Sequence, residues 1–501
     1  MVQGTEQQKP RDLPYELTLL ERMGEVSVNG IALKNVPIFE KYSLWHRFVL
    51  FVFSSDIRRF SASRSFSEYL KGEGGQHAGV SLKGFLVGLI GVFVSLLAWL
   101  FAIIRRPQVL IFGIDRVSDN AHKADFRLHA LYDFLQKNRI PYIECLHTVF
   151  NAAFLKNLFV RLRSALYLEA IDTWYAVLKR TGLAQKSKSV ELSGFDAFSE
   201  EEKKFVSYAV KKYLGERGLI QFRVKALSAF LSSTRPHAVW MIDDARHYHD
   251  LALAAKLAGI PTYAFQHGHF TRYHVGWLTN GSTLHYIRPE NLVVWSEYWK
   301  QELLRLGSVY PADALIVGGF PEASISLPSG VSKTLLILFV HETDSPKKEV
   351  AAYIARILEA MPEAKVVMKL RPDHPAQSQI EEYPGLAWGP RLISITNLAE
   401  LKERPGIVLG VYSTFLYDMV RKGAPVSIIE TSMDYGKGMV ENGLADSLTL
   451  SGIPVRLREL LATDRGVLEA RAKKLDSDVS LWGTLSDIAF RCGITKDNKV
   501  G

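Results

Sequence analysis

Two short polar stretches follow apolar runs and carry side chains that can exchange a proton at neutral pH. Gln266-His267-Gly268-His269 follows the run 260–265, and Asp243-Asp244 follows the run 238–242. A histidine, with an unperturbed pKa near 6.5, can take a proton from a hydroxyl group. Of two adjacent carboxylates, one can have a raised pKa and act as an acid or base. His267 and one of Asp243 and Asp244 are therefore the candidate catalytic residues. The alternatives are a loop histidine satisfied by the backbone and an aspartate that caps the next helix.

A second set of residues is suited to holding a phosphate. Lys369, Arg371 and His374 lie in or just after the apolar run 365–370, where two prolines rigidify the loop. Ser413 and Thr414 stand between an expected strand and an expected helix, where hydroxyls and free backbone amides bind anions. Cations and helix amides can neutralise a phosphate leaving group. These five residues are the predicted donor-binding set. The alternatives are a solvated basic loop and plain capping of the helix.

Further polar or glycine positions also come at the ends of expected strands. Ligands of open α/β sheets bind at the carboxyl ends of the strands, so these positions are expected to line the same cleft. They are Gln266, Gly268, His269, Gly318, His341 and Glu342.

Two series of alternating strands and helices place these residues. The first series begins at the run 109–114 and the second at the run 334–340. Short continuous apolar runs separated by helical segments are typical of buried parallel strands. The segment 320–332 is rich in Pro, Ser and Gly and is the predicted linker. The sequence therefore predicts an α/β protein with two Rossmann-like domains. The expected divisions are an N-terminal extension (1–107), an acceptor domain (108–320), a nucleotide-donor domain (333–455) and a helical tail (456–501).

Taken in order, the motifs resemble those of the GT-B glycosyltransferases of bacterial capsule and lipopolysaccharide biosynthesis, over roughly residues 108–450. His374-Pro375 and Ser413-Thr414 are similar to the pairs that contact the donor phosphate in bacterial sialyltransferases and related CMP-sugar enzymes. Asp243-Asp244 is similar to their acidic pair, which supplies the catalytic acid/base, although Ala245 stands where that group has glycine. His267 also resembles the histidine of the teichoic-acid glycerophosphotransferases, which share the fold and use CDP-glycerol.

This resemblance implies a GT-B glycosyltransferase that moves a sugar from a nucleotide-activated donor, a CMP-sugar, to a lipid-linked or growing surface polysaccharide. One alternative is a CDP-glycerol-type glycerophosphotransferase. Another is a non-catalytic, membrane-tethered glycan assembly factor on a GT-B scaffold. An epimerase acting on UDP-sugars would leave the apolar segment near the start unexplained. Neither a metal nor a cofactor beyond the nucleotide-sugar co-substrate is expected, because basic side chains and helix amides can stabilise the leaving group.

That apolar segment, Gly84 to Ile104, has 21 residues without a charge, enough for a helix to cover a hydrocarbon core of about 30 Å. It is predicted to attach the chain to a membrane, either by spanning it, by lying in its interface or by re-entering it; a buried helix is the other alternative. The shorter apolar run 45–53 is expected to lie at the interface, with Arg58 and Arg59 near lipid phosphates. Arginines after the segment place the downstream part of the chain on the cytoplasmic side. We therefore expect the protein at the cytoplasmic face of the inner membrane.

Composition and charge fit this expectation. The chain is 48% hydrophobic and 23% charged, which is typical of a globular protein. Its net charge of +9 suits anionic partners such as membrane lipid and a nucleotide, and no nucleic-acid module is recognisable. The expected partners are a nucleotide-sugar donor, a glycan or glycolipid acceptor and membrane lipid, without nucleic acid. The sequence leaves open the donor nucleotide and sugar, the acceptor, the stereochemical outcome and the oligomeric state.

Overall fold

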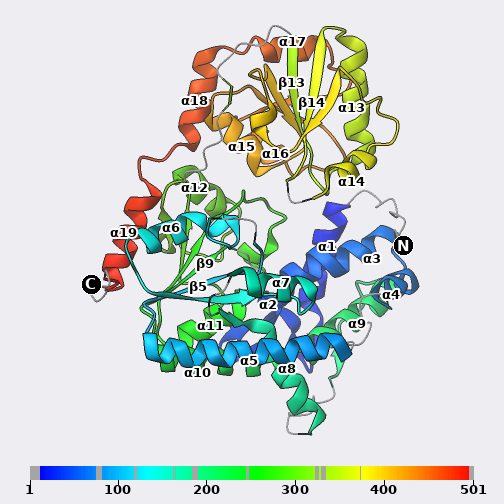
Figure 1. Cartoon of the computed structure of the whole chain (residues 1–501). Helices are drawn as coiled ribbons and strands as arrows, with labels where there is room; N and C mark the ends of the chain where they lie inside the picture. Colours follow the sequence, from blue (N-terminus) through cyan, green and yellow to red (C-terminus); the bar gives the residue numbers. More distant parts are fainter. Residues whose placement is uncertain are drawn as a thin grey trace.

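The structure is a computed structural model of the chain. It describes residues 12–74, 82–117, 121–161, 163, 165–182, 190–243, 248–321, 327–328, 335–372 and 374–495. Two sheet-containing domains lie one above the other in Figure 1, the first below and the second above. Helical segments from the beginning of the chain pack into the first domain.

The first domain is built on a parallel sheet that has seven strands among the described residues. In spatial order they are β12 (Leu315–Val317), β11 (Asn291–Val294), β10 (Thr262–Phe265), β9 (Ala238–Ile242), β5 (Val109–Ile114), β6 (Tyr142–His147) and β7 (Ala165–Tyr167). The chain therefore runs outward from β5 to one edge, returns beside β5 at β9 and continues to the other edge. This reversal is the mark of a doubly wound Rossmann-like sheet.

The second domain repeats this plan with six parallel strands among the described residues. In spatial order they are β15 (Leu392–Ile395), β14 (Ala364–Lys369), β13 (Leu335–Val340), β16 (Ile407–Gly410), β17 (Val426–Ile429) and β18 (Asp446–Leu448). The central strand β13 is apolar throughout because helices cover both faces of the sheet. The predicted fold class, two Rossmann-like α/β domains as in GT-B proteins, is confirmed.

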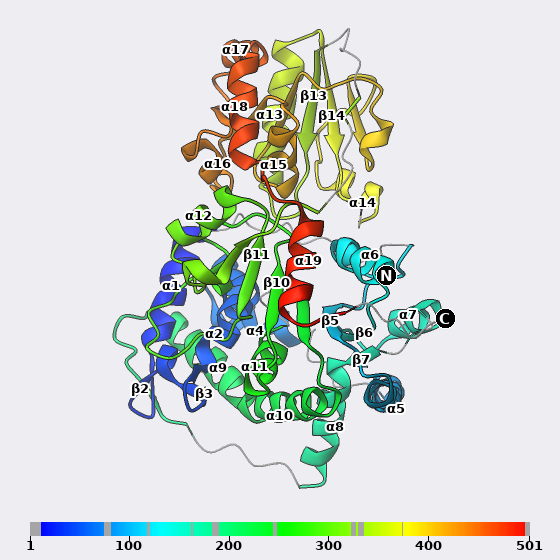
Figure 2. The same ribbon diagram turned by 90° about the vertical axis from the view of Figure 1, so that its left-hand side faces the viewer.

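Helices connect and cover the strands of both sheets. Those of the first domain are α6 (His129–Lys137), α7 (Ala152–Arg161), α8 (Leu168–Arg180), α9 (Glu200–Gly215), α10 (Arg217–Thr234), α11 (His249–Leu257) and α12 (Glu297–Arg305). Those of the second domain are α13 (Lys347–Ala360), α14 (Ala376–Glu381), α15 (Thr414–Arg421), α16 (Lys437–Glu441), α17 (Val455–Leu461) and α18 (Arg465–Leu475). The last helix, α19 (Leu481–Arg491), returns to the first domain and packs near α6 (Figure 2).

The beginning of the chain is part of the first domain's core. It forms α1 (Leu13–Glu25), α2 (Leu44–Phe51), a π-helix (Val52–Ile57), α3 (Arg58–Ser63) and α4 (Phe66–Gly74). Short strands accompany these helices, namely β1 (Ser27–Val28), β2 (Ile31–Ala32), β3 (Pro37–Phe39) and β4 (Tyr42–Ser43), with β8 (Leu192–Ser193) beside β1. Phe60 stacks on Phe205 of α9, with ring centroids 4.3 Å apart. On α2, Arg47 forms a buried ion pair of 2.7 Å with Asp250 of α11.

The expectation that the run 45–53 lies at a lipid interface is wrong. Most of its apolar side chains are buried in protein, with Phe48 2% and Phe53 1% exposed, and Leu50 and Phe51 are partly buried. The two arginines after it have protein partners, since Arg58 bonds to Asp344 and Arg59 to Asp56. The run is apolar because a protein core surrounds it.

The long apolar segment forms α5 (Leu82–Arg105), which runs along the outside of the first domain beside α8 and β7 (Figures 1 and 2). Within the described residues, Gly84–Arg105 is one helix long and apolar enough to cross a membrane. One third of its most apolar stretch is buried against the protein.

Candidate active site

The reversal of strand order fixes where a ligand can lie in each domain. A crevice opens where neighbouring strands lead their connections in opposite directions, at the carboxyl ends of those strands. In the first domain these strands are β5 and β9, and Asp243 directly follows β9. In the second domain they are β13 and β16, followed by His341 and by the segment that leads to Ser413. The predicted site residues therefore cluster about these two points.

Asp243 and His267 form a hydrogen-bonded pair at the edge of the first sheet. The imidazole Nδ1–H of His267 donates to Oδ1 of Asp243, and the backbone N–H of His267 donates to the same oxygen at 3.0 Å. The Asp243 carboxylate is buried, with 1% of its side chain exposed, whereas 27% of the His267 side chain is exposed. A buried carboxylate at Nδ1 selects the tautomer with its lone pair on Nε2. This is the state in which a histidine takes a proton from a hydroxyl group.

Gln266 shapes the loop that carries His267. Its side-chain oxygen accepts from the backbone N–H of Trp295 at 2.9 Å, and its Nε2 donates to the carbonyl of Gly268 at 2.8 Å. The Gln266 side chain is buried, and its two hydrogen bonds hold the loop in place. Gly268 has no positive φ, and a Cβ placed there would lie at an ordinary 3.5 Å from Thr414 Oγ1. Backbone conformation therefore does not require glycine at this position.

His269 connects the loop of the first domain to helix α15 of the second. The Thr414 hydroxyl lies 3.1 Å from His269 Nδ1 and accepts from the His269 backbone N–H at 3.3 Å. Burial, together with the nearby His267, lowers the pKa of His269 to about 4. His269 is therefore neutral at pH 7 and links the loop after β10 in the first domain to the start of α15 in the second.

In the second domain, the predicted site residues gather at the beginning of α15. The Ser413 hydroxyl caps the helix by accepting from the Phe415 N–H at 3.2 Å. It also hydrogen-bonds Glu342, which follows β13. Arg371 reaches the same carboxylate, with 3.4 Å between Nη1 and Oε2. Burial raises the pKa of Glu342 against the opposing effects of Ser413 and Arg371. Ser413, Glu342 and Arg371 thus form one polar cluster.

His341 lies behind this cluster and is 2% exposed. Its Nδ1 is 2.7 Å from the hydroxyl of Tyr383 and 3.4 Å from Nζ of Lys347. Burial and the neighbouring cations lower its pKa to about 3. His341 is therefore a neutral, buried ring in contact with Tyr383 and Lys347.

The loop with the predicted phosphate-binding cations is held by a residue that the sequence does not single out. Gln379 of α14 accepts from the Arg371 N–H at 2.9 Å and donates to the carbonyls of Arg371 and His374 at 2.9 and 3.0 Å. The His374 side chain is exposed above this loop. Lys369 instead donates to the Leu370 carbonyl at 2.8 Å, and its Nζ lies 5.7 Å from the Phe415 ring centroid.

One predicted residue, Gly318, stands apart from this arrangement. Gly318 is packed against Val293 and Thr484, and a Cβ at Gly318 would clash with the Val293 side chain at 2.1 Å. The absence of a side chain at Gly318 therefore serves its packing against β11 and α19. Asp244 lies outside the described residues. Among the residues that the structure describes, no group of three or more His, Cys, Asp and Glu side chains is placed to hold a metal ion.

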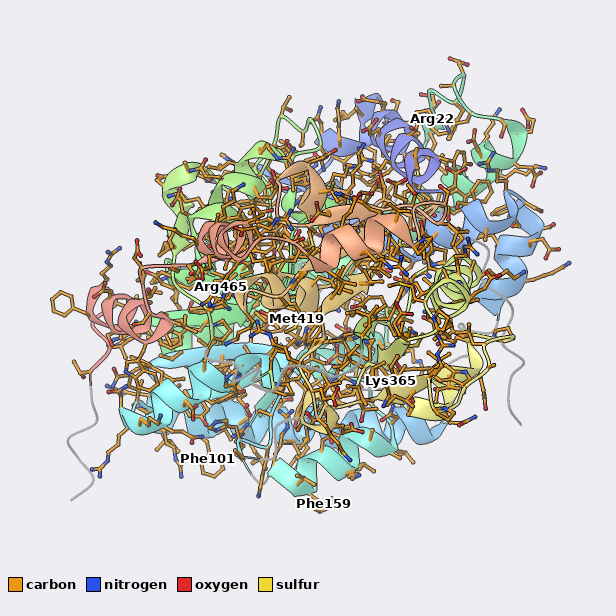
Figure 3. The ribbon with its side chains drawn as sticks, turned by 90° about the horizontal axis from the view of Figure 1, so that it is seen from above. Arg22, Phe101, Phe159, Lys365, Met419 and Arg465 are labelled. Carbon is orange, nitrogen blue, oxygen red and sulfur yellow. The ribbon has the colours of Figure 1, made fainter. Side chains whose placement is uncertain are left out.

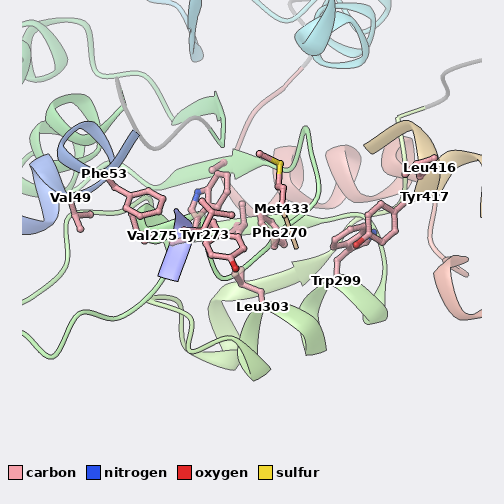
Figure 4. Close-up of a cluster of buried hydrophobic side chains, with 14 of the residues drawn as sticks. Val49, Phe53, Phe270, Tyr273, Val275, Trp299, Leu303, Leu416, Tyr417 and Met433 are labelled. Atoms are coloured by element: carbon pink, nitrogen blue, oxygen red, sulfur yellow. The ribbon is translucent and has the colours of Figure 1, made fainter. Parts of the chain in front are cut away.

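Aromatic and polar contacts join the two domains around the site. Trp299 of α12 packs on Tyr417 of α15, with ring centroids 4.6 Å apart (Figure 4). The hydroxyl of Tyr273 donates to Asp434 across the domain boundary. From the N-terminal segment, Arg58 bonds to Asp344 of the second domain at 2.8 Å. These contacts, which involve different segments of both domains, therefore hold the two domains in a fixed relative orientation.

No family model matches the chain, and neither does any curated protein. Solved structures with a similar arrangement include the MurG of Acinetobacter baumannii, which is 12% identical, covers 77% of this chain and 99% of its own, and has a TM-score of 0.43. The UDP-GlcNAc 2-epimerase of Neisseria meningitidis, bound to UDP-GlcNAc, is 13% identical, covers 76% of this chain and 99% of its own, and has a TM-score of 0.45. The glycosyltransferase SnogD of Streptomyces nogalater is 11% identical, covers 77% of this chain and 100% of its own, and has a TM-score of 0.46. At these identities and scores the likeness assigns no activity, so function must come from the site itself.

Proposed function

We propose that this protein is a glycosyltransferase that moves a sugar from a nucleotide-activated donor to a hydroxyl group of an acceptor. The observation that carries the proposal is the His267–Asp243 pair, positioned at the carboxyl edge of one sheet and linked through His269 to the start of α15 on the other. A base on one wall and an anion-binding helix end on the other are the two groups that such a transfer needs.

In the proposed reaction the acceptor hydroxyl attacks the anomeric carbon of the donor. His267 takes the hydroxyl proton on Nε2, and Asp243 stabilises the imidazolium that forms. The bond between the anomeric carbon and the phosphate oxygen breaks, and the nucleotide leaves with the electron pair. Arg371 and the backbone amides at the start of α15 stabilise the negative charge on that phosphate. Every charge that develops thus has a counterpart in this chain, and we propose a reaction without a metal ion.

The donor we propose is a CMP-sugar, and the acceptor a lipid-linked or growing surface polysaccharide. Support for the nucleotide comes from the motifs His374-Pro375 and Ser413-Thr414, which resemble the phosphate-contacting pairs of CMP-sugar enzymes. Nucleotide sugars are made in the cytoplasm, so we place the site on that side of the inner membrane.

A transfer of glycerol phosphate from CDP-glycerol is the competing reaction. The same pair supports it, because His267 can equally deprotonate a hydroxyl that attacks phosphorus instead of carbon. The two reactions break different bonds of the donor, although CMP leaves in both. They are separated by the group that the acceptor gains.

The test incubates the purified protein with CMP-sugars, UDP-sugars or CDP-glycerol, with and without glycan acceptors, and measures released nucleotide and the mass of the product. We expect consumption of a CMP-sugar, retained in the presence of a chelator and lost in His267→Ala. The matched control is His285→Ala, which removes an exposed histidine beside Tyr42. Turnover that survives His267→Ala contradicts the base assignment. The absence of turnover with every donor favours the non-catalytic scaffold.

A further inference from the structure

Helix α5 has two faces of different character. The inner face is a line of small residues at alternating spacings of three and four: Gly88, Gly91, Ser95, Ala98 and Ala102. A Cβ on Gly91 would lie 2.2 Å from the ring of Phe150, and one on Gly88 would lie 2.9 Å from Thr173 Oγ1. The small side chains of this face therefore let the helix pack closely against the first domain, which buries all five residues.

The outer face carries large apolar side chains that the described residues leave substantially exposed. Each is at least 39% exposed: Leu86, Leu89, Ile90, Phe93, Leu96, Leu97, Leu100, Phe101, Ile103 and Ile104. Soluble monomers rarely expose a continuous apolar surface of this extent. At about 1.5 Å per residue, this surface extends roughly 27 Å along the helix. It is therefore a built interaction surface, which we call the α5 outer face.

The chain on both sides of α5 belongs to the same domain. Before α5, Arg47 pairs with Asp250 of α11 and Phe60 stacks on Phe205 of α9. After α5, the chain enters β5, the central strand of the first sheet. Residues of α1 to α3 and of this sheet share one hydrophobic core. Both ends of α5 must therefore stay on one side of a membrane, and the helix cannot cross it while this domain is folded.

Positive charge and aromatic rings border the α5 outer face. The Arg180 guanidinium lies 5.4 Å from the Phe85 ring centroid near one end, and that of Arg105 lies 5.9 Å from Phe101 near the other. An apolar surface with a cation near each end matches the chemistry of a bilayer interface with anionic headgroups.

Helix α7 extends the apolar surface. Phe159 is 73% exposed and Val149, just before the helix, is 67% exposed. Figure 3 shows Phe159 and Phe101 on the same side of the molecule. Two helices of the first domain thus present apolar side chains in one direction.

We propose that α5 lies in the plane of an anionic membrane surface, with its outer face among the lipid acyl chains and Arg105 and Arg180 at the phosphates. The helix attaches the first domain to one leaflet without crossing the bilayer. A second copy of this chain is a poorer occupant, because pairing two such faces would bring their basic borders together. This inference concerns attachment alone and stands apart from the proposed reaction.

The first test is flotation of the purified full chain with phosphatidylcholine vesicles, with and without phosphatidylglycerol. We expect flotation with the anionic vesicles and much weaker flotation with the neutral ones. Changing Phe93→Glu and Phe101→Glu together should reduce the bound fraction by more than about tenfold, because two charges replace apolar contacts with lipid. Both sites face solvent in the isolated chain, so the thermal transition should not move.

Phe490→Glu is the matched control, since Phe490 is 85% exposed on α19, a different helix, and should leave flotation unchanged. If the double variant floats like the parent protein, the α5 outer face is not the contact and the proposal fails. The proposal also fails if neither protein floats and, without vesicles, the parent is a dimer while the double variant is a monomer. In that case a second copy of the chain, rather than lipid, covers the α5 outer face.

The second test decides whether α5 crosses. Single cysteines replace Glu68 before α5 and Glu200 after it, in a Cys492→Ser background in which the remaining Cys145 is buried. Membranes of an expression host are labelled with an impermeant maleimide. We expect both positions to react in inverted vesicles and neither in intact spheroplasts. Reaction of one position from each side would show a spanning helix and overturn the proposal.

Discussion

The Oδ1 oxygen of Asp243 accepts two hydrogen bonds from His267, one from the backbone N–H and one from the imidazole. The two residues lie 24 positions apart in sequence. They meet because β9 and β10 are neighbouring parallel strands whose carboxyl ends coincide. The backbone bond fixes the loop and the imidazole bond fixes the tautomer, so a single carboxylate oxygen sets both the place and the protonation state of the proposed base.

Asp243→Asn tests this relationship. With the asparagine oxygen at the position of Oδ1, both hydrogen bonds from His267 can persist, so the loop and the tautomer should be kept. A neutral amide, however, no longer stabilises the imidazolium that forms when His267 takes a proton. We expect kcat to fall by roughly 10²- to 10⁴-fold with little change in KM. Steady-state kinetics of Asp243→Asn, His267→Ala and the double variant measure it. The double variant should lose no more than His267→Ala alone, because the pair acts as a unit; additive losses would contradict the pairing.

Ser413→Ala tests whether the start of α15 binds the donor. Loss of the cap should lower stability by about 1 kcal/mol. Ser199→Ala removes a comparable cap from α9, far from the cleft, and should cost a similar amount. Only Ser413→Ala should also weaken nucleotide binding, by a factor of about 3 to 10, since one hydrogen bond contributes about 0.5–1.5 kcal/mol. Calorimetric titration with CMP checks it, and equal affinities in the two variants would remove Ser413 from the donor site.

Gln379→Leu tests the support of the basic loop. The buried leucine leaves the Arg371 N–H and the carbonyls of Arg371 and His374 without their partner. We expect a loss of about 1–3 kcal/mol in stability and weaker donor binding, because Arg371 is no longer held in place. Gln377→Leu on the same helix is the control: Gln377 is exposed and should change stability by less than about 0.5 kcal/mol. If Gln379→Leu binds donor as the parent does, the loop does not form the phosphate site.

The sequence predicts the sheets well where their strands are long and buried. The run 109–114 is β5 residue for residue, because a parallel strand covered on both faces is continuously apolar. The three-residue edge strands β7 and β18 escape prediction, since β18 reads Asp-Ser-Leu and has no apolar run. For the run 45–53, composition alone does not separate lipid from a protein core, because both reward the same side chains.

For the site, strand ends point to Asp243 and His267, but only the order of β9 and β10 brings the two together. Nothing in the sequence marks Gln379, whose role depends on a fold that places it beneath the loop. In α5 the sequence does carry a signal of how the helix packs: the spacing of Gly88, Gly91, Ser95, Ala98 and Ala102. Small residues on one face and large ones on the other indicate a helix that packs flat against protein on one side only.

His46 provides a further test, because its neutral form is fixed on both sides. Its Nε2–H donates to the Gly276 carbonyl at 3.1 Å, and its Nδ1 accepts from the Ile287 N–H at 3.1 Å. Protonation would place a proton on Nδ1 opposite that N–H. Burial is the main cause that lowers the pKa of His46 to about 4.

The lowered pKa of His46 sets the sign of the pH effect on stability. Below about pH 6.5 the unfolded chain takes up a proton at His46 while the folded chain does not, so stability declines as pH falls and the decline ends near pH 4. His46 alone should cost about 2 kcal/mol at pH 5 relative to pH 7.5. His46→Gln keeps a donor for Gly276 and cannot titrate. Between pH 7.5 and pH 5, its free energy of unfolding should therefore fall by about 2 kcal/mol less than that of the parent protein. Urea unfolding of both proteins at the two pH values measures the difference. Parallel pH profiles would mean that His46 is protonated within the folded chain.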